Sequence, residues 1–145
     1  MIKPVPGLPI EGQPESWVLR AVVWAEARGE SSVGKLAVAW VIGNRAKNRG
    51  STIKAEVLRP WQFSSFNHSD PNRSKLQTAH ETDPDGWAAC DAVCELFEKN
   101  STLDPTLGAS HYYVLTMPHP PVWGRGHKDW QETVVLGAHV FGKTA

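Results

Sequence analysis

One segment of the chain is apolar on almost every side, and the rest must fold around it. Residues 33–42 form one apolar face at helical spacing, and further apolar side chains cover the other faces; they are Val33, Leu36, Ala37, Val38, Ala39, Trp40, Val41 and Ile42. A helix that is apolar on most sides is buried on most sides. We therefore expect a central core helix in one domain of 145 residues, which can bury roughly two thirds of its unfolded surface.

Periodicity and end signals predict the other elements. The expected helices span 14–28, 32–48, 52–58 and 83–99, with Gly29 and Gly50 as stops and Ser31 or Ser32, Thr52 and Asp83-Pro84 as starts. Short strands are expected at 110–115, 133–136 and 139–141, with a turn at Gly137-Ala138. Residues 1–13 are predicted to be an extended lead-in, and 60–80 a polar, irregular stretch. The prediction is a single helix-rich α+β domain, with a small β element near the C-terminus.

Glu26 falls in the last turn of the first expected helix, beside the apolar stripe that Val22 and Ala25 help to form. Partial burial and the negative end of the helix dipole both disfavour a charged carboxylate, so we expect the pKa of Glu26 to be raised. An acid of that kind can protonate a glycosidic oxygen. The alternative is a structural carboxylate paired with Arg28 or Arg45.

Four motifs follow one another along the chain: Glu26–Glu30 with Gly34 and residues 37–45, then Pro60–Ser64, Ala109–Tyr113 and Leu136–Gly142. Together they resemble the SleB/CwlJ family of cell-wall hydrolases, which includes spore cortex-lytic enzymes and phage lysins. The resemblance implies a lysozyme-like fold, a peptidoglycan substrate and lytic transglycosylase activity carried by one glutamate, at the position of Glu26. Residues 117–130 depart from the family, because they are longer, more basic and more aromatic.

The number of carboxylates at the site separates two glycosidase mechanisms. A muramidase needs a second carboxylate at roughly 5–9.5 Å from the acid, and Glu30 is the nearby candidate. A transglycosylase needs none, because the C6 hydroxyl of the muramic acid residue attacks and one glutamate acts as acid and then as base. The simpler interpretation of Glu30 is a first-turn residue beside the positive end of the next helix.

Further residues are candidates for binding the glycan. The substrate-binding candidates are Asn44, Gln62, Phe63, Ser64, His111, Tyr113 and Trp123. Gly43 leaves room for substrate or backbone, and Arg45 is more readily explained by an ion pair with a glutamate. On a strand, His111 and Tyr113 share one face, and we expect Tyr112 to pack in the core. Seven tryptophans leave some rings free to stack on sugars.

Other classes of protein are less well supported. A zinc amidase needs converging ligands, and the six histidines form no His-Glu-x-x-His motif. A cysteine endopeptidase would use Cys90 or Cys94, which we expect to be buried, inert thiols on one helix. A non-catalytic wall-binding or virion protein would not need a tuned acid. We expect no metal and no cofactor.

Charge and the N-terminus bear on partners and location. Lys plus Arg and Asp plus Glu both number 15, which argues against bulk attraction to nucleic acid or to an anionic membrane. Prolines interrupt the N-terminal stretch, so neither a signal peptide nor a membrane span is expected. The resemblance favours a monomeric phage-type endolysin, made in the cytoplasm and released to the murein layer by a holin-type membrane protein. Loading onto a virion or deposition on a spore are the alternatives. The protein's expected partner is the peptidoglycan glycan strand.

Overall fold

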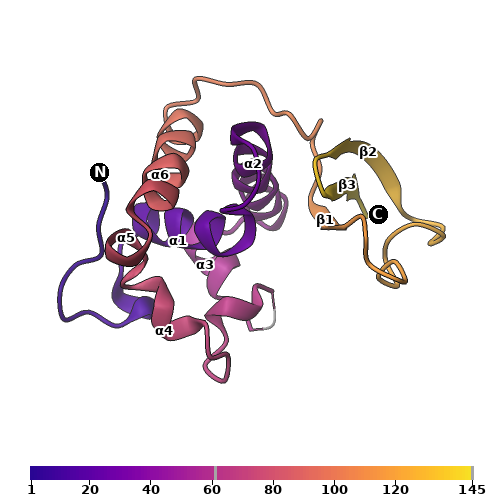
Figure 1. The fold of residues 1–145 in the computed structure, drawn as a ribbon. Helices are drawn as coiled ribbons and strands as arrows, with labels where there is room; N and C mark the ends of the chain where they lie inside the picture. The colour runs from indigo at the N-terminus through magenta and orange to yellow at the C-terminus, as the bar shows by residue number, and fades with distance from the viewer. Residues whose placement is uncertain (61, 145) are drawn as a thin grey trace.

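A computed structural model describes residues 1–60 and 62–144 and places a small sheet beside a helical body (Figure 1). The helices are α1 (Glu15–Ala27), α2 (Ser32–Arg49), α3 (Ile53–Leu58), α4 (Arg73–Leu76), α5 (Ala79–Thr82) and α6 (Pro84–Glu98). Single 3-10 turns lie at Ile10–Gly12 and Ser64–Phe66. The strands are β1 (His111–Val114), β2 (Gln131–Leu136) and β3 (His139–Lys143). The helix-rich α+β class is confirmed.

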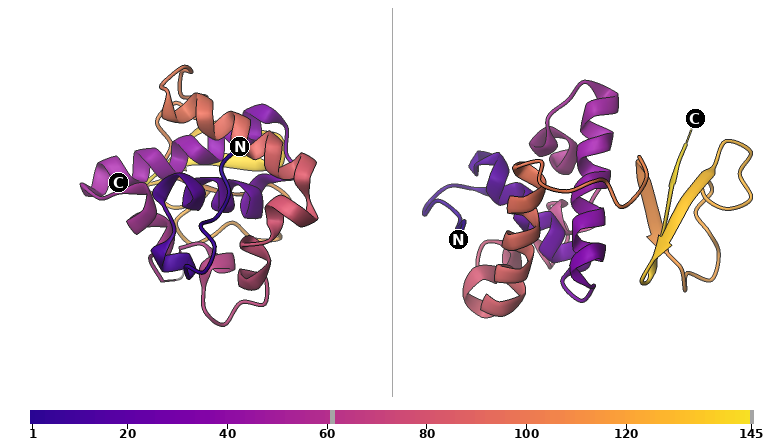
Figure 2. Two further views of the ribbon diagram at one scale, coloured as in Figure 1. Left: turned by 90° about the vertical axis from the view of Figure 1, so that its left-hand side faces the viewer. Right: turned by 90° about the horizontal axis from the view of Figure 1, so that it is seen from above.

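Helix α2 lies between the other long helices and the sheet (Figure 2). Its Val38, Ala39 and Ile42 belong to the main core, which α1 and α6 share. Ala37 and Val41 belong to a second cluster, together with Ala109 and Phe141 of the sheet side. The helix is apolar nearly all round because it has two packed faces, as the sequence predicted. The exception is Val33, which is 50% exposed.

The helices begin and end close to the capping residues and glycines that the sequence predicted. Ser31, Thr52 and Asp83 each accept a backbone N–H with their side chains at the starts of α2, α3 and α6. Gly50 ends α2 in the left-handed conformation at φ 63°, which a glycine adopts without strain. Helix α1 ends at Ala27 with Arg28 as its C-cap in right-handed angles, so Gly29 follows the cap directly and the helix stops within one residue of the predicted end.

The sheet is antiparallel with the order β1-β3-β2. Gly137, at φ 55°, turns the β2–β3 hairpin where the sequence predicted a turn. Tyr112 pairs with Phe141, and both rings pack on the α2 side. Because successive side chains on a strand alternate in direction, His111 and Tyr113 lie on the outer face. The register of β1 therefore decides which ring meets the helices.

Two stretches are more ordered than the sequence indicated. The lead-in contains a 3-10 turn with Ile10 buried, and the amide of the fully buried Gln13 bonds to the backbone of Val5 and Leu8. Within 60–80, the 3-10 turn at Ser64–Phe66 and α4 bury Phe66 and Leu76. Both stretches look irregular in sequence because only isolated residues of each are apolar.

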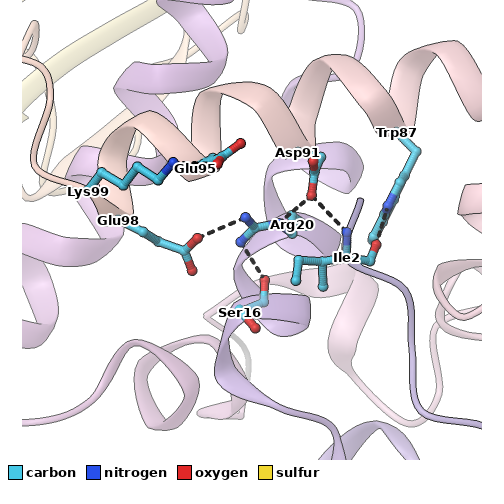
Figure 3. A network of polar contacts seen from close by, with 8 residues as sticks. All are labelled: Ile2, Ser16, Arg20, Trp87, Asp91, Glu95, Glu98 and Lys99. Atoms are coloured by element: carbon cyan, nitrogen blue, oxygen red, sulfur yellow. Dashed lines mark hydrogen bonds and ion pairs between the residues drawn. The ribbon is translucent and has the colours of Figure 1, made fainter.

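A buried arginine fastens α1 to α6 (Figure 3). Arg20 is 3% exposed; its Nε lies 2.8 Å from Asp91 Oδ1, and its Nη2 lies 2.8 Å from Glu98 Oε1. The backbone N–H of Ile2 also donates to Asp91, and the indole N–H of Trp87 donates to the carbonyl of Ile2. These contacts hold the N-terminal segment and α1 in place, and with them the last turn of α1, which carries Glu26.

Candidate active site

A polar cleft of about 400 Å³ opens where the last turn of α1, the C-terminal half of α2 and strand β1 meet. Its lining residues are Glu26, Arg45, Arg49, Gln62, Phe63, His111, Tyr112 and Trp123. Five of them were predicted from the sequence as site residues: Glu26, Gln62, Phe63, His111 and Trp123. The cleft thus joins residues that are far apart in the chain.

Glu26 is half-buried in this cleft, and Tyr112 holds one of its oxygens. The phenolic hydroxyl of Tyr112 donates a hydrogen bond of 2.6 Å to Glu26 Oε1. Burial raises the pKa of Tyr112 well above its ordinary value, and the neighbouring Glu26 raises it further. The phenol therefore stays protonated and acts as a donor to the carboxylate. Among the described residues Glu26 has no arginine partner, so the alternative of a pair with Arg28 or Arg45 is wrong.

The sequence missed the role of Tyr112, which was predicted to be a core residue. Its ring does pack with both core clusters, but its hydroxyl reaches the cleft. One signal was available: a tyrosine on the buried face of a strand needs a partner for its O–H. An acidic residue at the end of an apolar helix is a natural acceptor.

Arg45 reaches the cleft from α2 and is held by neutral groups. Its Nε donates to the carbonyl of Ser110 at 3.0 Å, and its Nη1 donates to Gln62 Oε1 at 3.2 Å. The guanidinium also lies over the ring of Phe63, with its carbon 5.5 Å from the centroid. The predicted ion pair of Arg45 with a glutamate is absent from the described part of the chain. Burial lowers the pKa of Arg45, although a guanidinium remains charged at neutral pH.

Arg49 lies one turn further along α2 and also lines the cleft. Its Nε lies 3.0 Å from Oε1 of Glu56, a fully buried residue of α3. The arginine side chain itself is 41% exposed. Arg49 therefore neutralises a buried carboxylate while keeping part of its guanidinium accessible to the cleft. No pattern in the sequence indicated this pair, because it depends on how α3 packs against α2.

The Pro60–Ser64 motif holds three predicted substrate-binding residues, and two of them line the cleft. Gln62 is half-buried and Phe63 is 3% exposed, and both line the cleft. Ser64 is exposed at the start of the 3-10 turn and lies outside the cleft lining. Trp61 of the same motif lies outside the described residues.

Aromatic rings cover the outer face of β1. His111 packs on Trp123 with centroids 5.0 Å apart, and Tyr113, Trp123 and Trp130 contact one another at 5.7 to 6.0 Å. A Cβ at Gly142 would lie 2.4 Å from the Trp130 ring, so the last glycine of the tail motif makes room for it. Residues 117–130 thus fold back onto the sheet. They carry Trp123 to the cleft, while Tyr113 is buried beneath them, outside the cleft lining.

Burial lowers the pKa of His111 to about 4, and the charges of Arg45 and Arg49 lower it further. Its Nδ1 lies 2.9 Å from the hydroxyl of Ser110. At neutral pH the imidazole is uncharged, so it offers the cleft a neutral donor or acceptor. Arg45 and Arg49 line the cleft beside His111, so two cationic groups face this part of it.

Glu30 lies away from the cleft lining. Its Oε1 is 3.0 Å from Nδ1 of His139, which is nearly buried at the start of β3. Its side chain also lies against Gly137 in the hairpin turn, where an added Cβ would be 3.1 Å from Oε2. Lys35 donates to the Glu30 carbonyl. These contacts connect the α1–α2 turn to the sheet.

Asn44 and Gly43 take part in the packing around α2. The Asn44 amide donates to Asp104 Oδ2 and to the Ala109 carbonyl, both at 2.9 Å. It therefore fastens the 99–110 connection that leads to β1. A Cβ at Gly43 would lie 2.7 Å from the ring of Phe97, so the missing side chain makes room for this ring of α6, where the sequence suggested substrate or backbone.

The described residues contain no group of three or more potential metal ligands. Cys90 and Cys94 are free and buried, and burial raises the pKa of both thiols, that of Cys90 to about 11. Within residues 1–60 and 62–144, no helix combines the length and hydropathy needed to cross a bilayer.

Comparison with known proteins gives one family match. A family model described as Cell Wall Hydrolase matches residues 29–142. The match includes every cleft residue except Glu26, which lies three positions before it begins. No curated protein and no solved structure matches the chain.

Proposed function

Because the chain belongs to the cell wall hydrolase family of the SleB type, we propose that it is a lytic transglycosylase that cleaves the MurNAc–GlcNAc bond with Glu26 as acid and base. Degradation of peptidoglycan follows from the family itself. One observation carries the finer assignment: Glu26 lies in a polar cleft with one carboxylate oxygen held by Tyr112. The other oxygen, Oε2, has no protein partner among the described residues.

In the first step, protonated Glu26 donates its proton from Oε2 to the glycosidic oxygen. The bond from that oxygen to C1 of the muramic acid residue breaks, and the bonding electrons leave with the GlcNAc hydroxyl. Positive charge then develops at C1 and the ring oxygen, as in other glycosidases. Tyr112 holds Oε1, so that Oε2 keeps its direction toward the scissile bond.

In the second step, the Glu26 carboxylate accepts the proton of the C6 hydroxyl of the same muramic acid residue. The freed oxygen attacks C1 and closes a 1,6-anhydro ring. The proton that Glu26 gave away is thus replaced, and no water is consumed. One residue serves as acid and then as base, which general acid–base catalysis permits when geometry and proton affinity suit both steps.

The position of Glu30 supports this choice over a muramidase. The hydrolytic mechanisms need a second carboxylate across the scissile bond. Glu30, the nearest candidate in sequence, contacts His139 and the hairpin turn instead of lining the cleft. Its contacts support a structural role between the α1–α2 turn and the sheet.

Mass spectrometry of the products tests the proposal. Purified peptidoglycan is digested with the protein, and the soluble muropeptides are compared with those from a hydrolytic muramidase. We expect muropeptides that end in 1,6-anhydromuramic acid, one water lighter than the hydrolysis products and resistant to borohydride reduction. Reducible ends would show a muramidase, and glycan strands released without their peptides would show an amidase.

The biological role we propose is that of a phage-type endolysin, on the basis of the resemblance to phage lysins. The protein would be made in the cytoplasm and would reach the murein layer through a lesion formed by a holin-type membrane protein. Expression in a bacterial host tests this role. Lysis should follow only when the membrane is permeabilised, and prompt lysis without permeabilisation would contradict it.

A further inference from the structure

The cleft contains more positive charge than glycosidic cleavage requires. Arg45 and Arg49 lie one helical turn apart on α2, and both line the cleft with Glu26. Arg45 is 8% exposed, and its hydrogen-bond acceptors are a carbonyl and an amide oxygen. Arg49 is balanced by Glu56. When Glu26 holds the proton that it must donate, the charge of Arg45 has no counterpart among the lining residues.

This charge opposes the chemistry of the reaction. The transition state of glycosidic cleavage carries positive charge at C1 and the ring oxygen. The carboxylate that Glu26 becomes on giving up its proton can balance this developing charge or the charge of Arg45, but not both in full. A fixed cation in a partly dehydrated cleft therefore still raises the energy of the transition state, because electrostatic interactions are stronger where water is excluded. An anion delivered with the substrate would remove that penalty. Both arginines line the cleft together with His111, whose pKa their charges lower after the larger effect of burial.

Peptidoglycan contains such an anion beside its scissile bond. The lactyl group of each muramic acid residue carries either a stem peptide with free carboxylates or, when the peptide is removed, its own carboxylate. A muramic δ-lactam carries neither. Guanidinium groups bind carboxylates through paired N–H donors, and Arg49 keeps 41% of its side chain exposed for such a contact.

We propose that Arg45 and Arg49 form a subsite for a carboxylate on the muramic acid substituent, so that the enzyme selects carboxylate-bearing strands over neutral strands. This inference rests on the proposed glycan cleavage at Glu26. Arg49 makes the direct contact, since it is the more exposed of the two. Arg45, fixed by Ser110 and Gln62, supplies the buried charge behind it.

Four forms of one glycan preparation test the selection. The first keeps its stem peptides, and the second has their carboxylates converted to amides with carbodiimide and ammonia. The third is stripped by an amidase, which leaves lactyl carboxylates, and the fourth is stripped and then amidated. We expect kcat/KM to fall at least tenfold from the first form to the second. A comparable fall from the third to the fourth identifies the lactyl carboxylate as a ligand, whereas uniformly slow cleavage of both stripped forms identifies the stem peptide.

Equal cleavage of the charged and amidated forms would overturn the carboxylate subsite and leave the proposed function intact. Failure to cleave any of the four forms would overturn the proposed function and the subsite with it. The two failures are therefore distinguishable in one experiment.

A variant tests the part assigned to Arg49. Arg49→Lys keeps a cation beside the buried Glu56 but removes the planar fork of donors, and Lys47→Arg is the matched control on an exposed residue of the same helix. We expect Arg49→Lys to slow cleavage of the charged strands severalfold more than cleavage of the amidated strands, in a variant shown to be folded by its thermal melt. Equal losses on both substrates would overturn the role of Arg49 in selection.

Discussion

The hydroxyl of Tyr112 on β1 donates a 2.6 Å hydrogen bond to Oε1 of Glu26 at the end of α1. The two residues are 86 positions apart in the chain, and their contact joins the sheet to the helical body at the cleft. The bond fixes one oxygen of the carboxylate, and the other has no protein partner among the described residues. The proposed proton transfers depend on this geometry.

Tyr112→Phe tests the positioning role of the hydroxyl. The ring keeps its packing against Phe141 and His139, so the fold should persist. A hydrogen bond to a charged group contributes about 1.5–3 kcal/mol, so turnover of peptidoglycan should fall by roughly tenfold or more, with little change in KM. The measurement is the initial rate of clearing across a range of substrate concentrations.

Tyr113→Phe is the matched control for that variant. The Tyr113 hydroxyl is buried without a hydrogen-bond partner among the described residues, and it lies outside the cleft lining. Its removal should leave turnover within about twofold, because no contact is lost. Equal losses in both variants would show that Tyr112 acts only through the packing of the sheet.

Glu30→Gln should affect stability more than catalysis. The change removes the charge that faces His139 at 3.0 Å but keeps the shape of the side chain. We expect a melting temperature lower by about 2–4 °C, which corresponds to about 1 kcal/mol in a domain of this size. Turnover should stay within about threefold of the wild type. A loss as large as that of a Glu26 variant would instead identify Glu30 as a second catalytic carboxylate.

His111 should make the folded state less stable in mild acid. Its pKa is about 4 in the folded protein against an ordinary 6.5, so between these values the unfolded chain binds a proton that the folded chain does not. The contribution of His111 to stability is therefore fully present above pH 6.5 and declines as the pH falls toward 4. Denaturant unfolding gives the free energy of unfolding at pH 7 and at pH 5. The loss of this free energy between the two pH values should be smaller for His111→Gln than for the wild type. An identical loss would contradict this.

The cysteines should be unreactive in the folded enzyme. Both thiols are buried, and the pKa of Cys90 is raised to about 11, so little thiolate forms at neutral pH. Iodoacetamide should add no mass to the native protein and two carbamidomethyl groups to the unfolded protein, and clearing should survive the treatment.

Clearing of peptidoglycan should survive EDTA as well. Loss of clearing on chelation, with recovery on adding zinc, would support a zinc amidase instead.

Local signals in the sequence predicted the fold well. The two-sided burial of α2, the caps at Ser31, Thr52 and Asp83 and the hairpin at Gly137 all follow from neighbouring residues. The predicted end of α1 before Gly29 was right to within one residue, although the C-cap, Arg28, keeps right-handed angles.

The cleft was predicted only in part, because its contacts depend on tertiary register. The hydrogen bond between Tyr112 and Glu26 forms only when β1 packs at one particular position along α2. That position depends on tertiary packing, which the sequence alone does not specify. Likewise, the ion pair of Arg49 with the buried Glu56 depends on how α3 packs against α2. The likeness to lysozymes remains a prediction.

Replacement of Glu26 by glutamine tests the central claim most directly. The glutamine side chain cannot donate or accept the catalytic proton, while its amide keeps an oxygen for the Tyr112 hydroxyl. The initial rate of peptidoglycan clearing should fall by about 10²-fold or more, the usual contribution of general acid catalysis, with a melting temperature like that of the wild type. A folded Glu26→Gln protein that clears peptidoglycan at the wild-type rate would contradict the assignment of Glu26 as the catalytic acid.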